Sequence, residues 1–197
     1  MKPEPAGWKP FDAVQHIAVF PPGFVWDARI RMAPGVAVRV RDGFVQGEGT
    51  MSASLMGWKT ILRVENTRDI AAAALMRYLA EAVWVPTALL PSAGVVWSSV
   101  DDSTARATLA AGGTSASLDF RFRPNGLVAS IFAAARGREV DCKSIPTPWQ
   151  GRWTAWEDHG GMRIPVEGEV EWLLPDGPQP YWRGRITRVA YDLRREG

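Results

Sequence analysis

The run from Ile70 to Val96, IAAAALMRYLAEAVWVPTALLPSAGVV, is the feature that most limits how this chain can fold. It is almost entirely apolar, yet it contains Arg77 and Glu81, which would lie one turn apart on the same face of a helix. A helix that is apolar on most sides must be covered by the rest of the protein. Two charges inside it are costly to bury unless they are paired. The run therefore predicts a buried helix that carries either a structural ion pair or the polar end of a pocket.

The residues that flank this run define the expected helix. Asn66 or Thr67 can cap its N-terminus, and Asp69 lies favourably at the positive end of the helix dipole. Pro86 should stop or kink the helix. The two central charges, with Pro86 and Pro91 inside the run, argue against a segment that spans a membrane.

The rest of the chain has the period-two pattern of strands. Apolar and charged residues alternate over 26–32 and 36–41, and turns are expected at Pro34-Gly35, Asp42-Gly43 and Pro124-Asn125-Gly126. Gly47 and Gly49 inside a strand pattern suggest a bulge or the close approach of another element. Residues 143–151 have the composition of a loop. Further strands are predicted over 11–19, 95–100, 105–109, 116–122, 127–136, 153–157, 167–174 and 181–193.

Short connections favour antiparallel neighbours, so these elements predict an α+β fold. We expect one strongly curved antiparallel sheet, a half-barrel, wrapped around the single apolar helix. A cleft between such a sheet and its helix is a favoured place for a ligand. At 197 residues the chain should form one domain over 1–197, with a short N-terminal tail over 1–10.

Composition excludes several classes of protein. The net charge is +2, and the cluster Arg29, Arg31, Arg39 and Arg41 alternates with apolar residues, as on the solvent face of strands, so we expect no nucleic-acid partner. Cys142 is the only cysteine, so there is no disulfide framework. We expect no metal or other cofactor. The first residues lack the apolar core of a signal peptide, which predicts a cytoplasmic protein. The oligomeric state stays open.

Four segments carry a resemblance to a known family: PPGFVWDA (21–28), RYLAEAVWVPTALL (77–90), VDDSTARATL (100–109) and PYWRG (180–184). Together they resemble a bacterial family described only as a domain of unknown function, over most of the chain from about Phe20 onward. The resemblance implies no activity. It implies a fold that looks like the half-barrel of lipoprotein carriers, from which this chain departs in lacking a secretion signal.

Glu81 is the candidate acid or base. A carboxylate kept ionised by Arg77 at the floor of a cleft could bind or transfer a proton. Asp101 and Asp102 are candidate partners, although adjacent strand residues point to opposite faces and only one of them would face the cleft. The alternative for Glu81 is a structural ion pair with Arg77. The alternatives for Asp101 and Asp102 are an Asp-Asp-Ser turn or a cap for Arg106.

Tryptophan is unusually frequent, with ten residues against three tyrosines. Tryptophan side chains are common in cores, interfaces and ligand clefts. Burial in the core is the simplest expectation for Trp26, Trp58, Trp84 and Trp97. Candidates for the wall of the cleft are Trp97, Trp149, Trp153 and Trp156.

Three hypotheses about function remain open at this point. The first is a protein that binds an apolar or amphipathic small molecule, lipid-like or aromatic, with Arg77 as the anchor for an acidic head group. The second is an enzyme in the same cleft that uses Glu81 as general acid or base, for example an ester or glycoside hydrolase or an isomerase. The third is an interaction module that uses an exposed sheet edge.

Overall fold

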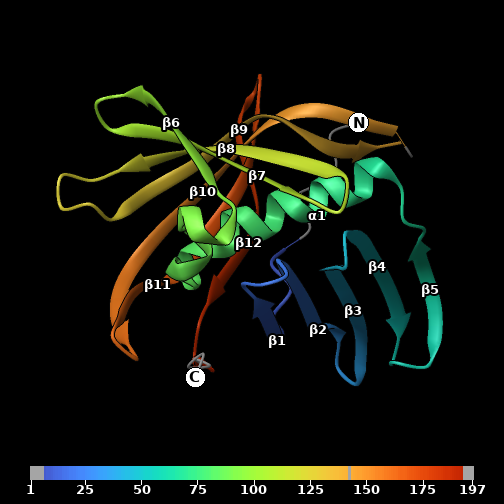
Figure 1. Ribbon diagram of the computed structural model, residues 1–197. Coiled ribbons are helices and arrows are strands. Elements are labelled where there is room, and N and C mark those ends of the chain that lie inside the picture. The colour runs from blue at the N-terminus through green and yellow to red at the C-terminus, as the bar shows by residue number, and fades with distance from the viewer. Residues whose placement is uncertain (1–6, 142, 193–197) are drawn as a thin grey trace.

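The computed structural model describes residues 7–141 and 143–192, and its strands form two open antiparallel sheets with one α-helix (Figure 1). Residues 1–6 of the predicted tail and Cys142 lie outside the described residues. Sheet 1 has the order β1-β2-β3-β4-β5, with β1 Phe11–Ala18, β2 Gly23–Ala33, β3 Val36–Val45, β4 Glu48–Leu55 and β5 Lys59–Val64. Sheet 2 has the order β12-β11-β10-β9-β8-β7-β6, with β6 Val96–Asp101, β7 Thr104–Ala111, β8 Thr114–Phe122, β9 Val128–Val140, β10 Lys143–His159, β11 Met162–Leu174 and β12 Gly177–Arg185.

The prediction of antiparallel strands around one helix is confirmed, but the prediction of a single sheet is wrong. The chain leaves sheet 1 at the end of β5, forms the helical segment and returns as β6 at the edge of sheet 2. Each strand pairs with its neighbours in sequence, and β5 does not pair with β6. A period-two pattern reports which residues lie on strands, but it does not report where hydrogen bonding between strands stops.

The helix α1 spans Arg68–Glu81, and the rest of the apolar run forms short 3₁₀ turns. The amide of Ile70 donates to Thr67 Oγ1 at 3.3 Å, so Thr67 is the N-cap, and Asp69 lies in the first turn. The turns are η1 Ala82–Trp84, η2 Pro86–Leu89 and η3 Pro91–Ala93, and the last two begin at the prolines. A proline at the first position of a turn has a fixed φ and no N–H to leave unpaired, so it starts each turn and separates it from the preceding one.

The core lies where α1 passes between the two sheets (Figure 1). Leu75 and Leu79 of the helix are fully buried and belong to one cluster with residues of both sheets. Sheet 1 contributes Phe24 and Phe44, and sheet 2 contributes Leu118, Phe120 and Ile131. The helix therefore joins two sheets that share no hydrogen-bonded strand pair.

Gly49 confirms the expectation of close approach by another element. A Cβ atom built at Gly49 of β4 would lie 2.6 Å from the carbonyl oxygen of Ile70, in the first turn of α1. Such a distance is shorter than van der Waals contact allows. Glycine at this position therefore lets the start of the helix pack directly on β4.

Three local predictions are corrected by the strand boundaries. The turn expected at Asp42-Gly43 lies at Gln46-Gly47, and Asp42 is on β3, where it pairs with β2 and β4 and its carboxylate binds Arg77. The expected loop 143–151 is the first part of β10, where Pro146 faces Gly137 of β9 and a bulge lies between Thr147 and Trp149. Proline is tolerated there because this part of β10 pairs with β9 alone. The last strand ends at Arg185, and Leu193 lies outside the described residues.

Candidate functional site

Arg77 and Glu81 form an ion pair near the centre of the molecule. Arg77 Nε donates to Glu81 Oε1 at 2.8 Å, and its Nη1 donates to Asp42 Oδ2 of β3. Gln15 of β1 completes the group, because its Nε2 donates to Glu81 Oε2 at 2.7 Å. The side chains of Arg77 and Glu81 are only 18% and 13% exposed. The sequence predicted the pair on the helix, but not that both partners also bind sheet 1.

The environment of Arg77 keeps its guanidinium charged. Burial alone would lower the pKa of Arg77, but the carboxylates of Glu81 and Asp42 outweigh it and the pKa is raised. The guanidinium carbon also lies 4.9 Å from the ring centroids of both Phe24 and Trp26. Cation–π contacts at this distance stabilise the cation further. The cation is thus held by two carboxylates and two aromatic rings.

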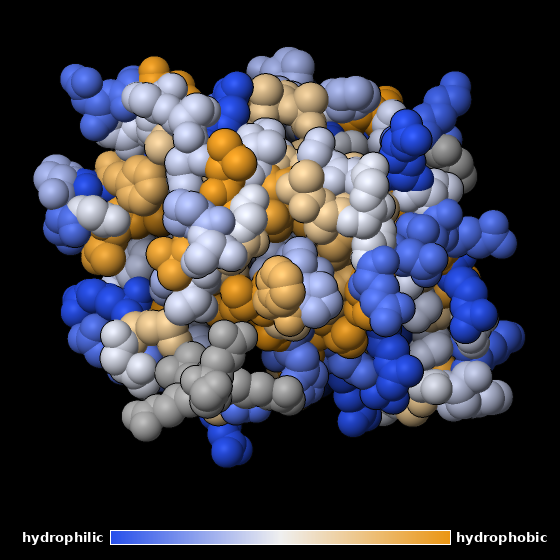
Figure 2. Space-filling view, in the orientation of Figure 1, coloured by the Kyte–Doolittle hydropathy of each residue, from blue (hydrophilic) through white to orange (hydrophobic). Residues whose placement is uncertain are grey.

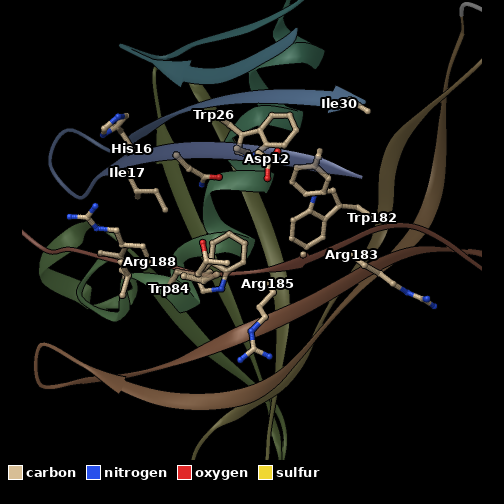
Figure 3. A pocket seen from close by; sticks show the side chains of 18 of the residues that line it. Asp12, His16, Ile17, Trp26, Ile30, Trp84, Trp182, Arg183, Arg185 and Arg188 are labelled. Carbon is tan, nitrogen blue, oxygen red and sulfur yellow. The ribbon is translucent and has the colours of Figure 1, made fainter. Parts of the chain in front are cut away.

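A long open groove lies beside this ionic group, between the edge strand β1 of sheet 1 and the edge strand β12 of sheet 2 (Figure 3). Its volume is about 2440 Å³. Gln15 lines it, whereas Arg77 and Glu81 lie behind Gln15 and do not. The apolar side chains that line it include Phe11, Ala13, Ile17, Trp26, Ile30, Trp84, Val85, Trp172 and Trp182.

Aromatic rings from distant parts of the chain meet in the groove. The centroid of Trp182 on β12 lies 6.1 Å from that of Phe11 on β1 and 6.4 Å from that of Trp84 after the helix. Figure 3 shows Trp182, Trp26 and Trp84 around the same space. The groove wall is therefore built from the paired strands β1 and β2, the turn after α1 and β12, and no local motif in the sequence marks it.

The segment after β12 runs along the groove. Ile186 N donates to Val166 O at 2.8 Å, and the hydroxyl of Tyr191 donates to the carbonyl oxygen of Trp84 at 2.8 Å. Burial raises the pKa of Tyr191. Residues from Ile186 to Asp192 line the groove throughout. This segment crosses from sheet 2 to the 3₁₀ turn that follows α1, and a hydrogen bond holds it at each end.

The tryptophans that were candidates for the cleft wall do not line this groove. Trp153 and Trp149 are 1% and 4% exposed and belong to the core, while Trp97 and Trp156 pack against it. Trp97 Nε1 donates to Leu89 O at 2.9 Å, which fixes it under the 3₁₀ turns.

Three of the tryptophans expected in the core have other positions, and one of them, Trp26, is partly buried and lines the groove. Trp58 is 81% exposed, because β5 is the edge strand of sheet 1 and Trp58 precedes it in the turn. Trp84 packs edge-to-face on Trp153, with centroids 5.1 Å apart, and also lines the groove.

Asp101 and Asp102 lie at the exposed turn between β6 and β7. Asp101 Oδ1 accepts from Ser103 N at 2.8 Å and from Ser103 Oγ at 3.1 Å, and these contacts lower the pKa of Asp101. Both aspartates line a shallow hollow of about 290 Å³ rather than the groove. Arg106, for which a cap was an alternative, pairs instead with Asp119. The structure therefore does not bring the two aspartates into one site with Gln15 and Glu81.

Arg136 is a second guanidinium on the inner side of the molecule. Arg136 of β9 pairs with the buried Thr147 of β10 next to the bulge, and its guanidinium carbon lies 5.3 Å from the ring centroid of Trp149. Burial lowers the pKa of Arg136, and its Nη1 has no hydrogen-bond partner among the described residues. Trp149 Nε1 in turn donates to the hydroxyl of Tyr181, a groove residue, at 2.8 Å.

Within residues 7–141 and 143–192, no three His, Cys, Asp or Glu side chains come close enough to hold a metal ion. No helix among these residues is long and apolar enough to cross a membrane.

Comparison with known proteins gives one match. A model of a family of unknown function, DUF6920, matches residues 1–191. No curated protein matches the chain, and no solved structure does so either. The match covers all four segments that carry the resemblance, and it brings no known activity.

Proposed function

We propose, for a chain that belongs to the DUF6920 family of unknown function, that the groove between β1 and β12 binds an apolar or amphipathic small molecule. The observation that carries the proposal is the aromatic wall formed by Phe11, Trp26, Trp84 and Trp182 along an open groove of about 2440 Å³. Small-molecule sites in proteins are concave and mostly apolar, with a few polar groups that orient the ligand. The groove has this composition.

The shape of the groove favours an extended ligand. Drug-sized molecules occupy sites of roughly 300 to 1,000 Å³, and this groove is larger and open along its length. A lipid-like chain or a multi-ring aromatic compound would cover more of its wall than a compact polar substrate. In this proposal the two sheets act as the two walls of a half-barrel, with the turns that follow α1 as its floor.

Gln15 is the polar contact that we assign to the ligand. Its Nε2 is committed to Glu81, so its Oε1 is the atom that can accept a hydrogen bond from a ligand hydroxyl or amide. Arg77 holds Glu81 and Asp42 and stands behind Gln15, so its role in the proposal is to fix Gln15 rather than to bind a head group. Arg138 and Gln179, 3.4 Å apart, offer further polar contacts from β9 and β12.

The enzymatic alternative would use Glu81 as acid or base. Both carboxylate oxygens of Glu81 accept hydrogen bonds, one from Gln15 and one from Arg77, and such bonds stabilise the ionised form. This arrangement suits a structural role in which Glu81 positions Gln15 and Arg77. Glu81 itself does not line the groove, and the carboxylate residues that do so among the described residues are Asp12, Glu139 and Asp192. We therefore favour binding over catalysis.

The test of binding uses two adjacent positions on β1. Ala13 lines the groove and is exposed, whereas Val14 points to the other face of sheet 1 and does not line it. Ala13→Trp should fill the groove without straining the core, and Val14→Trp should add the same side chain outside it. The wild type should carry a co-purifying small molecule in native mass spectrometry, or bind the apolar anion 1-anilinonaphthalene-8-sulfonate with increased fluorescence.

Ala13→Trp should reduce the bound mass or the probe affinity by about tenfold or more, and Val14→Trp should leave both unchanged. Equal binding by the two variants would contradict the groove as the site. Turnover of an ester or glycoside that is lost in Glu81→Gln, with probe binding kept, would instead support the enzymatic alternative.

A further inference from the structure

The outer face of sheet 1 carries a row of arginines that the groove does not use. Cross-strand pairs place Arg29 beside Arg39, and Arg41 and Arg63 on either side of Ser52, and paired residues share a face. Arg31 lies on the same strand face as Arg29. We call Arg29, Arg31, Arg39, Arg41 and Arg63 the arginine face.

The arginine face keeps an excess of positive charge. Among the described residues, Asp12 pairs with Arg31, and Asp27 pairs with both Arg39 and Arg41. Arg29 and Arg63 form no ion pair with any residue that the structure describes. On this face five arginines stand against three carboxylates, Asp12, Asp27 and Glu48, which leaves two positive charges. Lys59 pairs with Leu55 and lies on the other face of the sheet.

One end of the same sheet is apolar and exposed. The turn between β2 and β3 and the turn between β4 and β5 lie together at the end farthest from α1, because Met56 N donates to Ala37 O at 2.9 Å (Figure 1). Five large apolar side chains around these turns are exposed, and Trp58 is the most exposed of them. We call them the apolar end: Met32, Val36, Met56, Trp58 and Ile61.

The turn that carries Trp58 has an unusual residue type, methionine, at a position with positive φ. Met56 and Gly57 both have positive φ, at 54° and 83°, as in the two-residue turns that normally hold Asn or Gly. A methionine in this conformation costs free energy, and with 47% of its surface exposed it gains little from burial. Met56 Sδ accepts a hydrogen bond from Ala37 N at 3.4 Å, which helps to hold the two turns together. The exposed Trp58 at the tip of the hairpin, beside Lys59, is the feature that a contact with a partner would explain.

We infer that the apolar end and the arginine face of sheet 1 dock on the surface of a lipid bilayer that contains anionic lipids. Tryptophan is the residue type most characteristic of the boundary between headgroups and acyl chains, and methionine and isoleucine gain from insertion just below it. Arginine and lysine near an anionic surface attract phosphate headgroups, to which the guanidinium can donate two parallel hydrogen bonds. Figure 2 shows hydrophilic side chains over the sheet 1 side of the molecule and apolar ones nearer the centre of the view.

The docking surface is separate from the groove. The groove opens at β1 and β12, and of the residues assigned to docking it is lined by Met32 alone. Ala13→Trp, which should block the groove, is therefore expected to leave docking unchanged. Failure of the groove proposal and failure of this inference can be told apart by that variant.

The experiment is flotation of the purified full chain with vesicles of phosphatidylcholine alone and of phosphatidylcholine with about 30 mol % phosphatidylglycerol. The wild type should float with the anionic vesicles, and added salt should release it. Arg63→Glu should weaken binding by at least about fivefold, and Trp58→Ser by about tenfold. Matched controls at exposed positions of sheet 2 are Arg121→Glu, which makes the same charge change, and Val96→Ser, which also replaces an exposed apolar side chain by serine.

Circular dichroism of each variant would establish that the fold is kept. The inference would be overturned if the sheet 2 controls reduced vesicle binding as much as the sheet 1 variants do. Equal binding to neutral and anionic vesicles, or no binding to either, would also overturn it. Binding that depends on Arg63 but not on Trp58 would show contact with the lipid headgroups alone and would overturn docking through the apolar end.

Discussion

Gln15 and Glu81, which lie 66 positions apart in the sequence, are joined by a hydrogen bond of 2.7 Å from Nε2 to Oε2. This bond links the edge strand that opens onto the groove to the last residue of α1. Because Glu81 also accepts from Arg77, and Arg77 also donates to Asp42 on β3, one connected group of four side chains holds the helix to two strands of sheet 1. A change at any member should therefore reach the groove through Gln15.

The Arg77–Glu81 pair should stabilise the fold more than an isolated i,i+4 salt bridge on a helix would. Arg77→Met leaves two carboxylates in a poorly solvated place without their cation, so we expect a loss of about 3 to 5 kcal/mol in the free energy of unfolding. Glu81→Gln keeps an acceptor for Arg77, and Asp42 still compensates the charge, so the loss should be about 1 to 2 kcal/mol. Urea-induced unfolding measures both.

The control for this comparison is Asp12→Asn at the pair Arg31–Asp12, whose side chains are 60% and 78% exposed. Exposed pairs contribute less than about 1 kcal/mol, so this change should be nearly neutral. If Arg77→Met were as mild as Asp12→Asn, the four-residue group would not hold the helix to the sheet.

The parts of the fold that could be predicted from the sequence are the local ones. Thr67 as a cap, the spacing of Arg77 and Glu81 and the close approach at Gly49 each depend on residues within one or two turns or on a single backbone property. The partners of the ion pair could not be predicted in this way. Asp42 was expected in a turn because Asp-Gly is a turn signal, and the tertiary contact with Arg77 overrides that local preference.

The groove could not be predicted for a related reason. Its wall combines β1, the turns after α1 and β12, and only the division of the strands into two sheets brings these segments together. Apolar periodicity shows that Trp153 and Trp182 each lie on an apolar face, but not that one face is packed and the other open. Trp153 fills the core, and Trp182 lines the groove.

Asp27 should make stability depend on acid pH. Hydrogen bonds from Arg39, at 2.7 and 2.5 Å, and a further one from Arg41 lower the pKa of Asp27 from 3.8 to about 2. A carboxyl with a lowered pKa stabilises the fold fully above its ordinary pKa, and this contribution is lost as the pH falls from about 4 to about 2. After allowance for solvent screening we expect about 1 kcal/mol.

The measurement for Asp27 is the free energy of unfolding from about pH 5 to about pH 2 for the wild type and Asp27→Asn. The wild type should lose its advantage over the variant across this range, and high salt should reduce the difference. A constant difference between the two proteins at every pH would show that Asp27 does not titrate as the geometry requires.

Gly49→Ala should loosen the start of α1 from sheet 1. The added methyl group would meet the carbonyl oxygen of Ile70 at 2.6 Å, and since that atom belongs to the backbone, the helix or the strand must shift. Overpacking of this kind costs about 1 to 3 kcal/mol. Gly7→Ala is the control, because no heavy atom lies within 4 Å of the added group. Equal stability of the two variants would contradict direct packing of the helix on β4.

Tyr191 should control how fast a ligand leaves the groove. Its hydroxyl donates to Trp84 O at 2.8 Å and ties the segment after β12 to the groove wall. Tyr191→Phe removes a bond that contributes about 1 kcal/mol, so this segment should open more often, and the fluorescent anion proposed above should dissociate about fivefold faster.

Stopped-flow displacement measures the rate, and urea-induced unfolding should show little change, because Tyr191 is only half-buried. Asp102→Asn, at an exposed position that does not line the groove, should leave the rate unchanged. A rate unaffected in Tyr191→Phe would mean that the ligand leaves along the open length of the groove between β1 and β12, and that the segment after β12 does not gate it.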